Sequence, residues 1–187
     1  MPRASAADAA ATARRILNIA TAHFAEHGFA AASVDEIATA AGITRGAVYH
    51  HYASKPGLFT AVARAQQQAL AEAIETATDG VADSAALRIG SHAYLDAITQ
   101  GAAARLLLIE GPAVLSWEEW RRLDAEGPVA QLRDGLRLVG LADEAIEPMA
   151  TALSGAMNEL ALWLAQSTDA TAGRRAHAAL DRLLDAL

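Results

Sequence analysis

Residues 33–57 contain three helix starts in succession, and this segment limits the fold more than any other part of the chain. Ser33 and Thr44 are each followed by a helical pattern, and a side-chain hydroxyl at such a position can accept a hydrogen bond from an amide of the first turn. Ser54 then precedes a third start. The helices between these points must be short and joined by tight turns. One is expected to end at Gly42, and the next carries Val48 inward.

The first of these starts, Ser33-Val34-Asp35-Glu36, has the pattern of a capping box. The Ser33 hydroxyl is expected to accept from the Glu36 amide, while the Glu36 side chain reaches back to the Ser33 amide. Asp35 and Glu36 also suit the positive end of a helix dipole. The pattern therefore predicts a well-defined helix start here.

The rest of the chain is rich in alanine and leucine, and no stretch alternates apolar and polar residues for long. With 53% apolar residues among 187, the chain is long enough for a hydrophobic core. We expect an all-α protein of about nine helices: a three-helix helix-turn-helix domain over residues 1–55 and an antiparallel helical bundle over residues 56–187. The other expected helices are 8–27, with Gly28 as a left-handed stop, then one from Ser54 to about Thr78, and then 84–99, 102–114, 116–138, 145–166 and 171–186.

Charge is distributed unevenly between these two parts. The net charge is −7, yet residues 1–55 hold five basic and four acidic residues, against ten basic and eighteen acidic residues in 56–187. A slightly basic N-terminal part on an acidic body gives weak support to two separate roles.

The second short helix begins with side chains that a core would not select. Thr44, Arg45 and Gly46 occupy its first turn, which in a helix-turn-helix reaches base edges in the major groove. Arginine can pair bidentately with guanine, and Gly46 would allow close approach to DNA although it weakens the helix by about 1 kcal/mol. Phosphate contacts are expected from the exposed arc that follows and from the next helix start, through Tyr49, His50, His51 and Lys55.

Residues 12–62 resemble the DNA-binding domain of the TetR family of transcriptional regulators. The matching residues are Ile16-Leu17, Ala20, Phe24-Ala25-Glu26-His27-Gly28-Phe29, Ser33-Val34-Asp35-Glu36-Ile37-Ala38, Ala41-Gly42-Ile43, Val48-Tyr49-His50-His51-Tyr52, Lys55 and Leu58-Phe59. The resemblance covers about a quarter of the chain, and Pro56-Gly57 departs from the acidic residues usual after the lysine. The remainder is similar only in being helical and of suitable length.

The resemblance implies an Ω-shaped homodimer that binds double-stranded DNA at a palindromic operator and represses transcription until a small-molecule effector releases it. It implies a ligand pocket in the helical body and dimerisation through the last two helices. By position, Thr44, Arg45, Gly46 and Ala47 would face bases, and phosphate contacts would come from Ser33, Tyr49, His50, His51 and Lys55.

Candidate ligand-binding residues lie in the body, where polar groups interrupt apolar helices. Trp117 and Trp120 are one turn apart and could be core aromatics or line a cavity. For the polar residues a structural partner within the chain is the favoured interpretation, with ligand contact as the alternative. The candidates are His92, Glu110 and Asn158. Few charges are placed inside the body, which favours a largely apolar or aromatic effector.

Two apolar stripes near the C-terminus could be intramolecular core or a four-helix dimer interface, and with the resemblance we favour the dimer. They consist of Met149, Leu153, Met157, Leu160 and Leu164, and of Leu180, Leu183, Leu184 and Leu187.

Other functions find little support in the sequence. The pair His23 and His27 has metal-binding spacing but no visible third ligand, so we expect no metal site. No phosphate loop, nucleophile elbow or cysteine is present, so we expect neither an enzyme nor a cofactor. We expect no signal peptide and no membrane span, and hence a cytoplasmic protein. The remaining alternative is a helical ligand-binding or interaction module without DNA binding.

Overall fold

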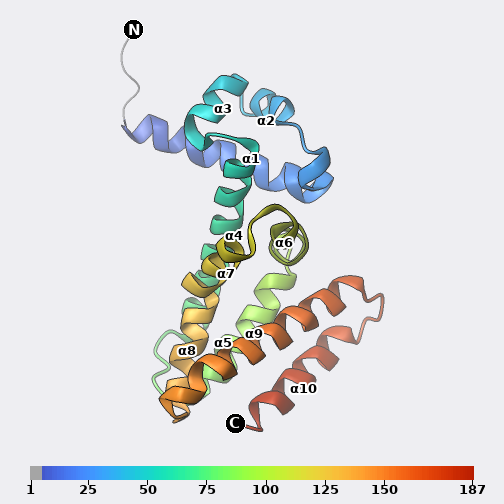
Figure 1. Ribbon diagram of the computed structural model, residues 1–187. Helices are drawn as coiled ribbons and strands as arrows, with labels where there is room; N and C mark the ends of the chain where they lie inside the picture. Colours follow the sequence, from blue (N-terminus) through green and yellow to red (C-terminus); the bar gives the residue numbers. More distant parts are fainter. Residues whose placement is uncertain (1–5) are drawn as a thin grey trace.

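The computed structural model describes residues 6–187; residues 1–5, where the predicted N-terminal domain begins, lie outside the described part. Over residues 6–187 the chain forms ten α-helices and one π-helical segment and has no strand, which confirms the all-α prediction. Figure 1 shows α1–α3 at one end of the molecule and the other helices at the opposite end, joined by the long helix α4. We call residues 6–54 the head and residues 79–187 the body.

The head packs three helices around aromatic and aliphatic side chains, and its helices are α1 (Ala6–Ala31), α2 (Val34–Ala40) and α3 (Arg45–Tyr52). Phe24 and Phe59 are fully buried and meet edge to face with their ring centroids 5.3 Å apart. Because Phe59 belongs to α4 (Lys55–Thr78), the same core fixes the head to the start of that helix. Ile16, Ile37 and Val48 complete it with no exposed surface.

Gly28 has φ of +73°, as the sequence predicted for a left-handed stop. The chain nevertheless makes one further helical turn to Ala31 after this kink. Left-handed φ values suit glycine because it has no Cβ.

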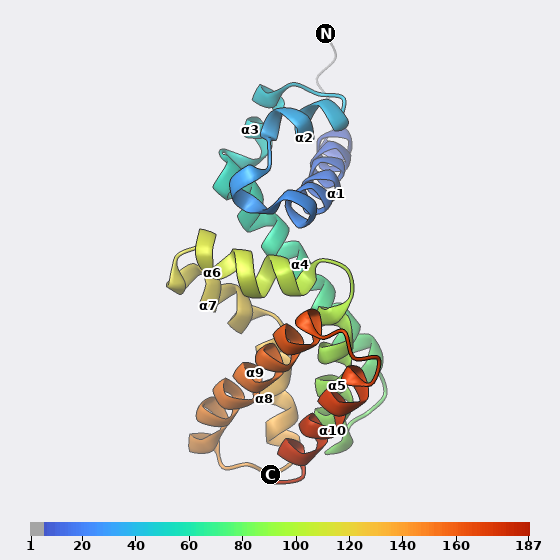
Figure 2. The same ribbon diagram turned by 90° about the vertical axis from the view of Figure 1, so that its right-hand side faces the viewer.

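The body packs its helices around α5, which contacts α4, α8, α9 and α10 (Figure 2). Its elements are α5 (Ala85–Thr99), η1 (Arg105–Glu110), α6 (Gly111–Val114), α7 (Trp117–Glu126), α8 (Pro128–Leu138), α9 (Asp143–Gln166) and α10 (Ala172–Leu184). None of the helices over residues 6–187 is long and apolar enough to cross a membrane.

Two helix predictions in the body were wrong in detail. The single helix expected over 116–138 is broken at Gly127, whose ψ of −123° is not helical, and Pro128 starts α8 because it has no amide hydrogen to continue α7. The helix expected over 102–114 contains the π-helical segment η1, which ends where Pro112 again interrupts the amide pattern.

Candidate nucleic-acid interface and effector cavity

The α2–turn–α3 unit is capped at both helix starts by its own side chains. Ser33 Oγ accepts from the Glu36 amide at 3.3 Å, and Thr44 Oγ1 accepts from the Ala47 amide at 3.2 Å. Gly42, with φ of +65°, makes the turn between the helices. Because the apolar faces of both helices are buried, the opposite face of α3 is presented to solvent.

The reciprocal half of the predicted capping box is replaced by a contact with α1. The Ser33 amide donates to His23 Nε2 at 3.2 Å, and the Glu36 carboxylate lies 3.1 Å from the same nitrogen. His23, whose spacing to His27 raised the question of a metal, therefore fixes the start of α2 to α1.

Arg45 is exposed on α3 and held by two neighbours. Its Nη1 donates to Asp35 Oδ2 at 2.9 Å, and its Nη2 donates to the Tyr49 hydroxyl at 3.1 Å. The guanidinium carbon lies 5.2 Å from the Tyr49 ring centroid. The hydrogen bond with Tyr49 and the charge of Asp35 raise the pKa of Arg45. The side chain is thus positioned at the surface by these two partners, and its contact with DNA stays a prediction.

The other predicted DNA-contacting residues surround Arg45 with varied exposure. Thr44, Gly46 and His50 are exposed, whereas Ser33, Ala47, Tyr49 and His51 are half-buried. Lys55 Nζ donates to the Ala30 carbonyl at 3.2 Å and lies 4.8 Å from the Phe29 ring centroid. The lysine side chain therefore packs against the C-terminal end of α1. Its contact with a DNA phosphate stays a prediction.

The joint between α3 and α4 is unusually tight. The Ser54 amide donates to the Tyr52 carbonyl at 2.7 Å, which closes a three-residue turn, and its central residue Ala53 has φ of +63°. The Tyr52 hydroxyl donates to the Ala13 carbonyl at 2.7 Å, so Tyr52 serves the core, as expected. A Cβ on Gly57 would lie 2.2 Å from the Tyr52 carbonyl oxygen. This crowding explains why position 57 is occupied by glycine.

The body contacts the head through η1 at the Gly28 kink. Glu110 accepts a hydrogen bond from the Phe29 amide at 3.1 Å, and Arg105 Nη1 donates to the Ala25 carbonyl at 2.6 Å. Arg105 Nη2 and Glu110 Oε1 are 3.7 Å apart. These two side chains form hydrogen bonds with backbone groups that lose their intrahelical partners at the kink in α1. We call Arg105 and Glu110 the η1 clamp.

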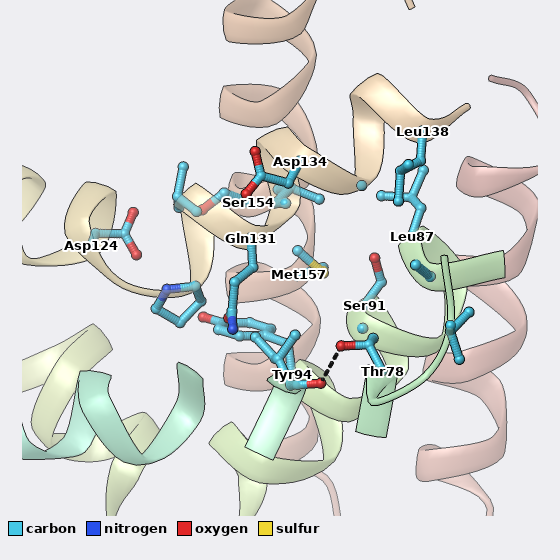
Figure 3. Close-up of a pocket in the computed structure, with 18 residues that line it drawn as sticks. Thr78, Leu87, Ser91, Tyr94, Asp124, Gln131, Asp134, Leu138, Ser154 and Met157 are labelled. Carbon is cyan, nitrogen blue, oxygen red and sulfur yellow. Dashed lines mark hydrogen bonds between the residues drawn. The ribbon is translucent and has the colours of Figure 1, made fainter. Parts of the chain in front are cut away.

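The body also encloses a cavity of about 200 Å³ between α4, α5, α8 and α9, with the end of α7 at its edge (Figure 3). Its wall is mainly apolar and includes Ile74, Leu87, Leu132, Leu138 and Met157. Three lining side chains have a buried oxygen without a hydrogen-bond partner among residues 6–187, namely Ser91, Asp124 and Gln131.

None of the five predicted ligand-binding residues lines this cavity. Trp117 is 70% exposed, and Trp120 Nε1 donates to the Leu107 carbonyl at 2.9 Å. Glu110 belongs to the η1 clamp. The two other polar candidates have partners inside the chain: His92 contacts His177 and Asp181, and Asn158 accepts from the hydroxyl of Tyr94, which does line the cavity.

Sequence analysis did not single out the three residues with unpaired oxygens. Gln131 and Asp124 occur in amphipathic helices among other polar residues, and Ser91 resembles any small helical residue. The burial of Asp124 could have been predicted from its position in α7. It lies one turn after Trp120 and therefore on the same inward face of the helix.

The predicted dimer stripes are divided between the core and the surface. Four residues are buried within the single chain and pack in its core: Leu153, Met157, Leu180 and Leu184. Met149, Leu160 and Leu164 are half-buried, and Leu183 is exposed together with Trp163 and Leu187. The buried residues are not available to a partner subunit. The dimer interface stays a prediction, and it would be formed by the half-buried and exposed residues.

Comparison with known proteins assigns both ends of the chain to one group. Residues 16–62 match the family described as bacterial regulatory proteins, tetR family. Residues 84–187, more than half of the chain, match the family described as Tetracyclin repressor-like, C-terminal domain.

Relatives agree with this assignment. The chain is 31% identical over 115 residues to the transposon Tn10 TetC protein of Escherichia coli and 41% identical over 71 residues to the HTH-type transcriptional repressor Rv1474c of Mycobacterium tuberculosis. The matches cover 62% and 38% of this chain, and it spans only 58% and 38% of those relatives.

A crystal structure of a TetR-family transcriptional regulator from Pectobacterium atrosepticum superposes with a TM-score of 0.75. It is 27% identical, and the match covers 98% of this chain and 97% of that one. The chain therefore belongs to the TetR family of bacterial transcriptional regulators.

Proposed function

We propose that this protein is a transcriptional repressor that binds a palindromic operator as a homodimer and is released by a small molecule bound in the body cavity. The observation that carries the proposal is the exposed face of α3, where Thr44, Arg45 and Tyr49 are held in place by a helix whose other face is buried. Family membership supports a regulator over an enzyme.

In this proposal α3 enters the major groove with its N-terminal turn toward the bases. Arg45 exchanges Asp35 for a guanine edge, while Thr44, Gly46 and Ala47 approach neighbouring bases. Phosphate contacts come from Ser33, Tyr49, His50, His51 and Lys55. Because several phosphates are neutralised by each subunit, affinity falls steeply with salt concentration.

The chain offers a direct connection between effector and DNA. Helix α4 starts beside α3 at Lys55, and its far end supplies Ile74 and Thr78 to the cavity wall. A ligand that displaces this end of α4 would change the position of the head relative to the body, and in a dimer the separation of two heads must match adjacent grooves. The domain boundary then falls at the start of α4, near residue 55.

The exposed apolar residues of α9 and α10 support the dimer part of the proposal. Trp163 and Leu183 remain exposed although both are large and apolar, and Leu160 and Leu164 lie half-buried on the same helix as Trp163. Pairing of these two helices with their counterparts would form a four-helix interface. The expected location is the cytoplasm, where the chromosome is accessible.

The test is selection of duplexes from a randomised DNA pool by the purified full chain at moderate salt. We expect a palindromic sequence. Arg45→Ala should then relax the preference at one base position in each half-site, and Lys55→Ala should weaken binding to all sequences. Arg122→Ala is the matched control, because that arginine lies on the body surface in α7 and pairs with Glu119 and Glu126.

Selection of no sequence by a folded, dimeric protein would favour the alternative of a helical ligand-binding or interaction module without DNA binding. Unchanged affinity in both Arg45→Ala and Lys55→Ala would show that the assignment of the α3 surface is wrong.

A further inference from the structure

We infer that the effector is an apolar molecule that carries a protonated amine, and that Asp124 is the group that binds this amine. The inference deepens the proposed function and rests on it, because it concerns the ligand of that regulator.

The polar groups of the cavity wall include three buried oxygens. Asp124 Oδ2, Gln131 Oε1 and Ser91 Oγ are buried and lack a hydrogen-bond partner among residues 6–187. The amide nitrogen of Gln131 is already used, since it donates to the Ala71 carbonyl at 3.0 Å. A carboxylate and an amide oxygen can only accept hydrogen bonds, and the Ser91 hydroxyl can do so. A ligand that satisfies these atoms must therefore be a donor.

The charged residues of the cavity wall are all acidic. The residues that line the cavity include two carboxylates, Asp124 and Asp134, but no lysine, arginine or histidine. Asp134 is at the rim, with a side chain that is 74% exposed and bonded to Arg137. Asp124 is inside, with only 4% of its surface exposed. An anionic ligand would meet negative charge without a cation to receive it.

The negative charge of Asp124 is only partly compensated by neighbouring groups of the protein. Arg121 Nη1 lies 3.5 Å from its Oδ2, and Gln67 supplies a hydrogen bond, yet burial still raises the pKa of this carboxyl group. Asp124 also lies in the last turn of α7, where the helix dipole disfavours an anion. A carboxylate in such a position destabilises the ligand-free protein, whereas it gives a buried ammonium group a partner.

The cavity wall itself is mainly apolar. Leu87, Leu132 and Met157 line it together with the three oxygen-bearing residues, and Figure 3 shows Asp124 at one side of the cavity and Ser91 at the other. A small hydrated cation would lose its water shell here without enough ligands to replace it. An apolar skeleton with one ammonium group matches both the wall and the acceptors.

The experiment compares matched probes that differ only in the polar group. The probes are 2-(1-naphthyl)ethylamine, 2-phenylethylamine and octylamine, each with the corresponding alcohol and carboxylic acid, titrated calorimetrically into the full chain at neutral pH. We expect at least one amine to bind about tenfold or more tightly than its alcohol, and its acid to bind more weakly still. Failure of all three amines to bind, or equal binding of an acid or alcohol, overturns the inference.

Two variants test whether the amine contacts Asp124. Asp124→Asn keeps the shape but removes the charge, and it should reduce amine affinity about tenfold or more while leaving the alcohol within about threefold. Asp134→Asn is the control at the rim, with an expected change of less than about threefold for both probes, because its charge is screened by water. Unchanged amine affinity in Asp124→Asn overturns the assignment of this residue.

DNA binding, measured with the selected operator, separates this inference from the proposed function. Release of DNA by an alcohol or acid, but not by an amine, would leave the repressor function standing and refute the amine. Binding of the amine through Asp124 without any effect on DNA would support the ligand class and refute its role as effector.

Discussion

The polar side chains of the head differ from those of the body cavity in their exposure and in their hydrogen bonding. In the head, Thr44 and Arg45 on the candidate DNA surface are exposed and have hydrogen-bond partners one helical turn away, in Ala47 and Tyr49. In the body, three buried oxygens of the cavity wall come from three different helices and lack a hydrogen-bond partner among residues 6–187. The side chains of the head surface therefore satisfy one another locally, whereas the cavity wall keeps hydrogen-bond acceptors that the described part of the chain does not satisfy.

This difference has a physical basis. Exchanging one exposed partner for another, such as Asp35 for a base, changes the free energy little because water screens both states. A buried acceptor without a donor destabilises the protein by roughly 1–3 kcal/mol, so a ligand that supplies the donor recovers that energy. The four predictions that follow test this contrast, starting with the largest expected effect.

Gly57→Ala should be the most damaging single-methyl change at the joint between the head and α4. The added Cβ would lie 2.2 Å from the Tyr52 carbonyl, so α3 and α4 must separate, and we expect a loss of about 3 kcal/mol in the free energy of unfolding together with weaker DNA binding. Chemical denaturation measures it. Gly173→Ala is the control, because nothing lies within 4 Å of its position. Similar stability in both variants would show that the joint is not tight.

Glu110→Ala tests whether the two regions are linked through the η1 clamp. Removal of the carboxylate leaves the Phe29 amide without its acceptor, and we expect a loss of about 1–2 kcal/mol. Glu110→Gln retains an acceptor oxygen and should lose less than half of that. If DNA release by the effector is unaffected in Glu110→Ala, the clamp does not transmit the signal and the link must run through α4 alone.

Asp124→Asn should stabilise the body by roughly 1 kcal/mol at neutral pH, because a buried charge with incomplete hydrogen bonding is replaced by a neutral amide. Burial raises the pKa of Asp124 in the folded protein above its value in the unfolded chain, so the folded state takes up this proton first. Stability of the parent protein should thus increase as pH falls through the raised pKa.

The measurement is the free energy of unfolding against pH for the parent and Asp124→Asn, whose difference should shrink toward acidic pH. A difference that stays constant or grows as pH falls would contradict the assignment of an unfavourable charge at Asp124.

Ala53→Gly should give the smallest effect, a gain of about 0.5–1 kcal/mol in the head. Ala53 has φ of +63°, a conformation that glycine adopts without strain. Ala69→Gly, at an exposed helical position of α4, should instead destabilise by about 1 kcal/mol. Loss of stability in both variants would show that Ala53 is not strained. Thermal unfolding followed by circular dichroism distinguishes the two.

The predictable features were those whose partners lie close in sequence. The caps at Ser33 and Thr44 and the positive φ of Gly28 depend on a few consecutive residues, and the structure has all three, although α1 continues to Ala31 beyond the expected stop. The Glu36 half of the capping box failed because a histidine from another helix, His23, competes for the same amide. The break at Gly127 was missed because glycine and proline within an amphipathic pattern do not say whether a helix bends or stops.

The sequence alone determined the all-α class and the α2–turn–α3 unit, because helix periodicity, caps and turn glycines act over distances of a few residues. Only the tertiary structure decided which polar residues face a cavity. Ser91, Asp124 and Gln131 come from α5, α7 and α8, and the packing of those helices leaves one buried oxygen of each without a hydrogen-bond partner among residues 6–187. The same packing buried Met157 and Leu180 inside one chain and left Trp163 and Leu183 on its surface. Burial depends on every helix that covers a residue, so no local pattern specifies it.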